Sequence, residues 1–280
     1  MSRFVYLLSE GVHDVAFLSR VLKNVYGASK IDLKSKLDEP RKRWINSFKW
    51  PVGEDIGRLA VPAPKLVHIP ASDSLIGLRN AEGIGRLKTT LEDDLEVLYK
   101  HEALPDTIGI FLDSDKEAQD QRFKKLRAEL LKVSMASGSL QIADALTAVG
   151  TGNPRVGIFA FPSPGVEGAL EDLLIEIGRA PYGHLCDRAR EYVNAWHAYV
   201  GNDTHKDWSE LKGQSGVKKA MFATVTAILK PGRGAVATIE DNRWVCDATR
   251  GHTALAPCLA FLSELLAPPA TAPATEGTTP

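Results

Sequence analysis

The sequence predicts an α/β fold in which a mostly parallel, four-stranded sheet is flanked by helices and followed by a helical extension. Four short apolar runs alternate with segments of helical periodicity over the first 180 residues. These runs have no polar alternation, which is typical of parallel strands covered by helices on both faces. With 280 residues, 44% of them hydrophobic, the chain is long enough for one sizeable core.

The chain begins with a strand, a loop and a helix. The apolar run at residues 4–8 predicts the first strand, and Val15, Leu18, Leu22 and Val25 recur at helical spacing after it. The later core elements follow in the same alternation. We expect strands at residues 65–69, 107–112 and 156–161, and helices at about residues 81–99, 123–133 and 170–177.

The domain organisation follows from changes in this pattern. Periodicity disappears between residues 29 and 64, a stretch with several prolines that we interpret as an insertion in a core formed by residues 1–180. Residues 181–266 are expected to form a helical extension packed on the core, and residues 267–280, rich in Pro, Ala and Thr, a disordered tail. The helices of the extension are expected near residues 187–199, 216–229 and 255–266.

Composition limits the classes of function and compartment. A net charge of −1 provides no general attraction to nucleic acid, so any such contact must be local. The three cysteines form no C-x-x-C pair and their number is odd, which favours a reducing cytoplasm. The chain opens directly on a strand without a charged leader and has no apolar run of membrane-spanning length, so we expect a cytoplasmic protein without a membrane partner.

Acidic side chains follow three of the predicted strands. Glu10 comes after the first strand, Asp113 and Asp115 after the third, and Glu167 and Glu171 after the fourth. The carboxyl ends of parallel strands meet at one edge of a sheet, where ligands bind in such folds. Carboxylates gathered there repel one another unless a cation neutralises them, and hard oxygen ligands suit magnesium, manganese or calcium.

Each acid also has a simpler interpretation. Asp14 lies in the first turn of the predicted helix, where a negative charge is favourable without any ligand. Glu167 and Glu171 are four residues apart, so on a helix they share one face, and this like-charge pair mildly favours a ligand role. A single charged residue is usually solvated surface, and the coincidence at three strand ends is what favours a site.

Two of these segments resemble the motifs of the Toprim family, which includes bacterial primases, topoisomerases, recombination mediators and the overcoming-lysogenization-defect (OLD) nucleases. Residues 8–14, Leu-Ser-Glu-Gly-Val-His-Asp, resemble its first motif, and residues 111–115, Phe-Leu-Asp-Ser-Asp, its second. The resemblance spans about residues 4–178 and is greatest to the OLD-like branch and to small uncharacterised bacterial Toprim proteins. It implies a Rossmann-like Toprim core.

The resemblance also implies a site and an activity. It implies Mg²⁺ or Mn²⁺ as cofactor, with metal ligands Glu10, Asp14, Asp113, Asp115, Glu167 and Glu171. The catalytic residues would be Glu10, Asp113, Asp115 and a downstream basic residue, Lys219 or its neighbour Lys218. The expected reaction is metal-dependent cleavage of DNA or RNA by an endonuclease or phosphodiesterase, with two ions about 4 Å apart. Alternatively, Glu10 acts as the general base or acid.

The insertion carries a candidate contact for nucleic acid. Residues 41–50 interleave basic residues with Trp44, Phe48 and Trp50, a composition suited to holding phosphates while rings stack on unpaired bases. Eight basic and five acidic residues give residues 29–64 a charge of +3, a modest patch. The same composition is compatible with a packed insertion.

Two rival functions stay open. The chain has no Gly-x-x-x-x-Gly-Lys phosphate-binding loop, so a partner ATPase or another protein subunit would come from a separate chain, and the protein would be a non-catalytic metal- or nucleic-acid-binding subunit of a defence or repair assembly. A haloacid-dehalogenase-like phosphatase would use Asp113 as nucleophile, but that fold usually carries its D-x-D motif after the first strand.

Overall fold

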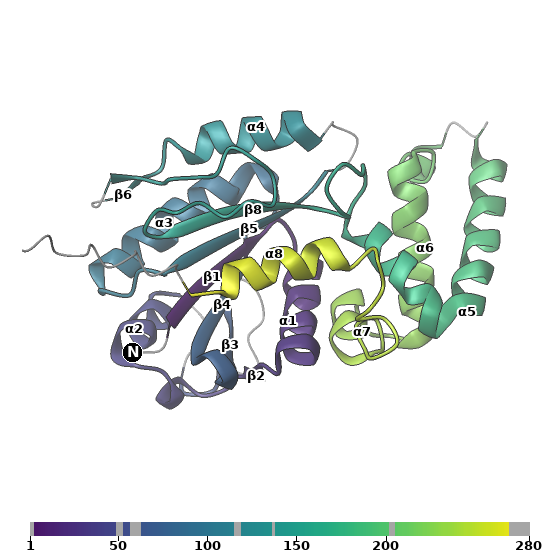
Figure 1. Ribbon diagram of the computed structural model, residues 1–280. Coiled ribbons are helices and arrows are strands. Elements are labelled where there is room, and N and C mark those ends of the chain that lie inside the picture. Colours follow the sequence, from purple (N-terminus) through teal and green to yellow (C-terminus); the bar gives the residue numbers. More distant parts are fainter. Residues whose placement is uncertain are drawn as a thin grey trace, which may run out of the picture.

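The fold is organised around one mixed, mostly parallel sheet, shown in the computed structural model of Figure 1. The structure describes residues 3–48, 53–56, 63–114, 119–135, 138–201 and 205–268. Within these residues the main sheet has six strands in the order β2-β3-β4-β1-β5-β8. The strands are β1 (Arg3–Ser9), β2 (Ser29–Lys30), β3 (Lys65–Ile69), β4 (Ser74–Asn80), β5 (Thr107–Asp113) and β8 (Arg155–Phe161), and β6 (Ser134–Met135) pairs with β7 (Gly138–Ser139) separately.

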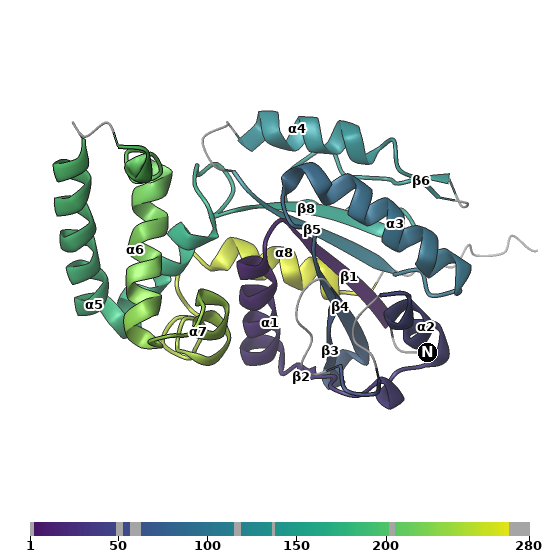
Figure 2. The ribbon, with the colours of Figure 1, turned by 180° about the vertical axis from the view of Figure 1, so that it is seen from behind.

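Helices cover both faces of this sheet. Figures 1 and 2 show α3 and α4 over one face and α1 and α8 over the other, while α5 and α6 form a pair that extends beyond the sheet. The helices are α1 (Val12–Tyr26), α2 (Glu39–Ser47), α3 (Leu87–Lys100), α4 (Gln119–Leu130), α5 (Leu170–Val200), α6 (Gln214–Leu229), α7 (Ala235–Asp241) and α8 (Ala256–Leu266). Short 3₁₀ turns occur at Lys34–Lys36, Pro70–Ser72, Ile84–Arg86 and Lys206–Trp208.

The central strand β1 explains why the fold has two apolar layers. Successive side chains of a strand point to opposite faces of its sheet. Val5 and Leu7 are buried in the core beneath α1, α5 and α8, whereas Phe4, Tyr6 and Leu8 are buried in the core beneath α2, α3 and α4. The continuous apolar run therefore fits a strand buried on both faces, as the sequence predicts.

The sheet is larger than the four strands predicted from the sequence. β4 is an additional strand that runs parallel to β1, with Ser9 opposite Asn80 at their carboxyl ends. β3 is antiparallel to β4, and β2 is antiparallel to β3, so the predicted strand at residues 65–69 is not part of the parallel set. β3 and β4 form a hairpin whose turn includes Asp73 with φ of 42°.

Helix α8, near the C-terminal end, packs directly on the sheet. Its Leu265 and Phe261 lie over Gly109 and Gly157, where an added Cβ atom would come within 2.6 and 2.8 Å of them. Glycine in a strand permits this close approach of a helix. The end of α8 is held by Arg3, which donates to the Leu265 carbonyl at 2.7 Å.

The three helices predicted in the last third of the chain correspond to parts of α5, α6 and α8. The bounds of α5 and of α3 differ from the prediction. α5 extends from Leu170 to Val200 with non-helical backbone angles at Tyr182, directly after Pro181. α3 begins at Leu87, later than predicted, because a short loop at residues 81–83 and a 3₁₀ turn at Ile84–Arg86 precede it. None of the described helices is long and apolar enough to cross a membrane. Most of the predicted tail, from residue 269 onward, lies outside the described residues.

Candidate metal site at the carboxyl edge of the sheet

Glu10 and Asp113 lie side by side because they follow adjacent strands. The backbone N–H of Glu10 donates to the Phe111 carbonyl at 3.0 Å, which continues the pairing of β1 with β5. The N–H of Asp113 donates to Glu10 Oε2 at 3.3 Å. Glu10 and Asp113, which the sequence predicts at one edge of the sheet, therefore lie next to each other and line one cavity.

Asp113 is also fixed by the helix that follows β8. The backbone N–H of Leu170, at the start of α5, donates to Asp113 Oδ1 at 2.9 Å. The first N–H groups of a helix lack partners within the helix and favour a nearby negative charge. Asp113 thus links the carboxyl end of β5 to the beginning of α5.

Asp14 is buried beneath the site and caps helix α1. Its Oδ2 accepts the backbone N–H of Gly11 at 2.8 Å, and its exposed fraction is 3%. Burial raises the pKa of Asp14 well above its usual value, and the charges of Asp113, Glu10 and Glu171 raise it further, while the hydrogen bond from Gly11 lowers it. Asp14 therefore caps the helix, as expected without any ligand, and its pKa also depends on the charges of the surrounding carboxylates.

Glu171, in the first turn of α5, is paired with His13 of α1. His13 Nδ1 lies 3.0 Å from Glu171 Oε1, and the His13 ring packs edge-on against Phe222 of α6. Burial raises the pKa of Glu171, but the hydrogen bond from His13 and the charges of His13 and Lys219 outweigh burial and hold it below its usual value. No role for His13 was expected from the sequence, and the structure places it in the site.

Glu167 does not share a helix face with Glu171, contrary to the prediction. It precedes the helix, because Gly168 adopts φ of 142° and α5 begins only at Leu170. The start of α5 is capped by Asp172, whose Oδ2 accepts the Ala169 N–H at 2.9 Å. Glu167 is exposed and lines a neighbouring cavity that also contains Glu171.

One open cavity of about 560 Å³ brings the other predicted residues together. Glu10, Asp14, Asp113 and Glu171 line it, and we call these four side chains the acidic edge. Lys219 of α6 lines the same cavity, while Lys218 is paired with Asp172 at 2.9 Å in the neighbouring one. The predicted ligand Asp115 lies outside the described residues.

Two residues of the site were missed by the sequence reasoning. Arg122 of α4 lies 3.3 Å from Glu10 Oε2, and its exposed fraction is 9%. Asn80 ends β4 beside β1 and lines the cavity. A buried arginine on a helix rich in exposed charges carries no distinctive sequence pattern, whereas Asn80 would follow from recognising β4 as a parallel strand.

The loop between β8 and α5 is anchored by two buried polar residues after β5. The Ser114 hydroxyl lies 2.7, 3.0 and 3.1 Å from the carbonyls of Phe161, Val166 and Gly168. Gln119 Nε2 donates to the Val166 carbonyl at 2.7 Å. These bonds fix the loop that precedes α5, and with it the position of Glu171.

The acidic edge has the chemistry of a site for a hard divalent cation. Its donors are carboxylate oxygens, and burial, together with the charges of the other three carboxylates, raises the pKa of Asp14. Among the described residues, no three His, Cys, Asp or Glu side chains are already arranged as a metal-binding group. The carboxylates that line this cavity, and that could hold an ion there, are those of Glu10, Asp113, Asp14 and Glu171.

The described basic and aromatic side chains of the insertion, Arg41 and Trp44, are buried in the core and are not exposed for stacking on nucleic-acid bases. Trp44 has an exposed fraction of 0% and meets Phe4 and Tyr6 edge-on at 5.6 and 5.9 Å between ring centroids. The Arg41 guanidinium, 5.2 Å from the Phe4 ring centroid, is buried with it. The interpretation of Trp44 as a base-stacking residue is wrong, because its ring completes the core over β1; Trp50 lies outside the described residues.

Comparison with known proteins gives a family and one structural relative. Residues 5–265 match the family model described as "Protein of unknown function (DUF3226)". A crystal structure of hypothetical protein PH0156 from Pyrococcus horikoshii OT3 is similar, with a TM-score of 0.55 and 17% identity over 94% of this chain and 95% of that one. At this identity the likeness concerns the fold alone. No curated protein gives a significant match.

Proposed function

The chain belongs to the DUF3226 family, and we propose that this family member is a divalent-metal-dependent enzyme that cleaves phosphodiesters of nucleic acid. The observation that carries the proposal is the contact of Glu10 with Asp113 at the ends of β1 and β5, where the Asp113 N–H donates to the Glu10 carboxylate. Both residues line one cavity that also contains Asp14, Glu171 and Lys219. The resemblance of the two motifs to OLD-like Toprim nucleases supports the same activity.

The side chains of the acidic edge divide into distinct tasks. Glu10 and Asp113, with Asp115, would hold Mg²⁺ or Mn²⁺, and Asp14 and Glu171 would add negative charge beside it. Such an ion activates a water molecule and stabilises the leaving oxygen of a phosphodiester. Asp113 is kept in place by the Leu170 N–H, and Glu171 by His13, so the carboxylates are oriented before substrate binds.

Lys219 supplies positive charge at the rim of the same cavity. It lies on α6 and lines the cavity with the acidic edge, and a lysine ammonium binds phosphate oxygens as a point charge. In this proposal Lys219 holds the phosphate against the acidic edge. Glu167, outside this cavity, would act on a neighbouring part of the substrate or on a second ion.

Cleavage assays test this proposal. Purified protein would be incubated with labelled single-stranded, linear duplex and supercoiled nucleic acids in Mg²⁺, Mn²⁺ or EDTA. We expect cleavage that requires the metal and falls by about 10² or more in Glu10→Gln and Asp113→Asn. Asp144→Asn is the matched control, because Asp144 is exposed and pairs with Arg127 away from the site. Metal-dependent cleavage that persists in both site variants would contradict the proposal.

A specific observation favours a second candidate, a non-catalytic metal- or nucleic-acid-binding subunit that works with another protein, such as an ATPase. The Arg122 guanidinium lies 3.3 Å from Glu10, so a protein cation already offsets part of the negative charge there. In a protein of this kind, metal or nucleic acid would bind without turnover. Binding without cleavage of any substrate would select this candidate.

A further inference from the structure

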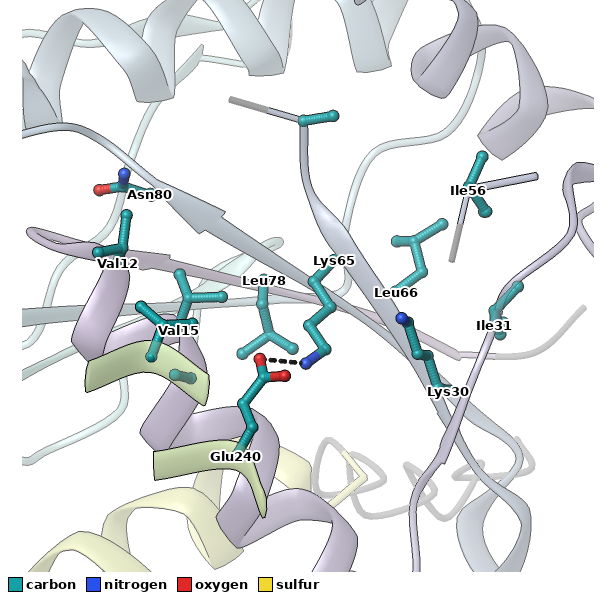
Figure 3. Close-up of a pocket in the computed structure, with 13 residues that line it drawn as sticks. Val12, Val15, Lys30, Ile31, Ile56, Lys65, Leu66, Leu78, Asn80 and Glu240 are labelled. Atoms are coloured by element: carbon teal, nitrogen blue, oxygen red, sulfur yellow. Dashed lines mark hydrogen bonds and ion pairs between the residues drawn. The ribbon is translucent and has the colours of Figure 1, made fainter. Parts of the chain in front are cut away.

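A second cavity of about 370 Å³ begins beside the acidic edge and runs between α1 and the β3–β4 hairpin. Figure 3 shows Val12 and Asn80 at one end of it and Lys30, Ile31 and Ile56 at the other. We call this cavity the α1–β3 groove. Its volume lies in the range of pockets that hold small organic groups.

The groove is continuous with the candidate metal site. Val12 and Asn80 line both the α1–β3 groove and the cavity of the acidic edge. Val12 is the first residue of α1, directly after Glu10 and Gly11, and Asn80 ends β4 beside the end of β1. A molecule held at the acidic edge can therefore extend into the groove without leaving the surface of the protein.

The walls of the groove are apolar and its far end is basic. Val15, Leu66 and Leu78 form walls of branched side chains from α1, β3 and β4. Lys30 lies at the far end, and Lys65 is bonded to Glu240 of α7 at 2.6 Å across one side, as the dashed line in Figure 3 shows. Apolar walls suit a flat, weakly polar ring, while one flanking phosphate would be held through a cation at the acidic edge and the other beside Lys30.

At the shared end, Asn80 provides a polar group of defined orientation. Its Oδ1 accepts the backbone N–H of Glu82 at 2.8 Å. This bond fixes the side-chain amide and leaves its NH₂ group to face the other way. An amide donor beside apolar walls can bond to a ring nitrogen or carbonyl of a base.

We propose that the α1–β3 groove holds one unpaired base of a single-stranded nucleic acid whose phosphodiester lies at the acidic edge. The inference rests on the proposed function, since it names the form of nucleic acid that this site accepts. In a duplex the bases are stacked and paired, so a base enters such a groove only from a single strand or after extrusion from the duplex. The next phosphate along the strand would lie near Lys30.

Binding measured in Ca²⁺ tests this inference separately from cleavage, because Ca²⁺ is a hard cation that can neutralise the acidic edge. Fluorescence anisotropy would compare a labelled single strand with a duplex of the same sequence, and a gel of the same samples would show that both are uncut. Val15→Phe and Val236→Phe fill the groove from α1 and α7. Val25→Phe makes the same change on α1, at a partly buried residue that does not line the groove. Thermal denaturation identifies which variants are folded, and the second groove variant replaces the first if one is not.

We expect the wild type to bind the single strand at least roughly tenfold more tightly than the duplex, and each folded groove variant to lose roughly tenfold in affinity, because the base no longer buries its surface against the apolar walls. Val25→Phe should bind as the wild type does. Unchanged single-strand binding in a folded groove variant, or equal binding of duplex, would overturn the inference. Competition by a free mononucleotide as strong as that by the strand would also overturn it, in favour of a nucleotide site.

The two proposals fail in different ways. Metal-dependent cleavage by the wild type, together with unchanged single-strand binding by the groove variants, would support the proposed function and contradict the role of the groove. If the groove variants bind the single strand more weakly but the wild type cleaves nothing in Mg²⁺ or Mn²⁺, the role of the groove is supported and the catalytic function is contradicted.

Discussion

Asp14 is the most deeply buried carboxylate of the acidic edge, and it faces two opposing demands. Its bond to the Gly11 N–H caps helix α1, which favours the ionised form. Burial and the charges of Asp113, Glu10 and Glu171 oppose that form more strongly, because they raise the pKa of Asp14. In the absence of a cation, an ionised Asp14 therefore destabilises the native protein.

Replacing Asp14 with Asn should stabilise the protein in EDTA at neutral pH. Because the folded pKa is raised, the native state retains its proton at a higher pH than the unfolded chain does. The free energy of unfolding of the wild type therefore falls as the pH rises from 3.8, the pKa of Asp14 in the unfolded chain, toward its higher pKa in the folded protein. Asp14→Asn has no carboxyl group at this residue and does not lose this stability. We expect a difference in Tm on the order of a few degrees at pH 7 that vanishes below pH 3.8.

Thermal denaturation of both proteins across this pH range measures the effect. Saturating Mg²⁺ should narrow the difference at pH 7, because a bound cation favours the ionised carboxylate in the wild type. An Asp14→Asn variant that is less stable than the wild type at pH 7 in EDTA would show that capping outweighs repulsion.

Ser114 links β5 to the loop before α5 through one hydroxyl. Ser114→Ala removes a buried hydroxyl that lies within hydrogen-bond distance of the Phe161 and Gly168 carbonyls, and only the Phe161 carbonyl keeps another donor from residue 114, its backbone N–H at 3.1 Å. We expect a loss of about 1–3 kcal/mol in the free energy of unfolding, measured by urea denaturation. Ser209→Ala is the control, since Ser209 is exposed, and its effect should lie within about 0.5 kcal/mol. Equal effects of the two changes would contradict the anchoring role.

At the scale of secondary-structure elements, the beginnings of α1 and α5 bring the site together. Both helices start with a backbone N–H capped by an aspartate three residues later, Asp14 in α1 and Asp172 in α5. Both also direct their first turn toward the acidic edge, through His13 and Glu171. The loop before α5 makes this possible, because Gly168 turns the chain at φ of 142°.

Gly168→Ala should disturb this helix start. A Cβ atom at this residue would collide with the Asp172 carboxylate, and the positive φ strains any residue other than glycine. We expect a loss of about 1–3 kcal/mol in stability, with weaker metal binding because Leu170 no longer holds Asp113. Calorimetric unfolding and metal titration measure the two effects.

Gly183→Ala, within α5, is the matched control, because an added Cβ atom there meets no other atom within 4 Å. This change should be neutral or stabilising by up to about 1 kcal/mol. A Gly168→Ala variant that behaves like Gly183→Ala would show that the turn does not depend on glycine.

The same elements show which parts of the fold the sequence predicts. β1 and β5 are continuous apolar runs, so their burial, and the acids that follow them, could be predicted from composition and spacing. β4 was not predicted, because its apolar run is short, at residues 75–78, and polar residues lie on both sides of it. Its place beside β1 depends on pairing between distant parts of the chain. Long-range pairing of this kind leaves no local pattern.

At the scale of the whole molecule, the site draws on elements from widely separated parts of the chain. Glu10, Asp113, Glu171 and Lys219 come from β1, β5, α5 and α6, and Arg122 joins them from α4. The sequence identified the acids because strand ends converge at one edge of a parallel sheet. It could not identify Arg122, whose contact with Glu10 depends on how α4 packs over the sheet.

The most direct test of this account is a calorimetric titration of the metal-free protein with Mn²⁺. We predict saturable binding in the wild type that is weakened about tenfold or more in Glu10→Gln and in Asp113→Asn, because each substitution removes a charged ligand. The control Asp144→Asn should bind Mn²⁺ as the wild type does. Unchanged Mn²⁺ affinity in both Glu10→Gln and Asp113→Asn would show that the acidic edge is not a metal site and would contradict the account.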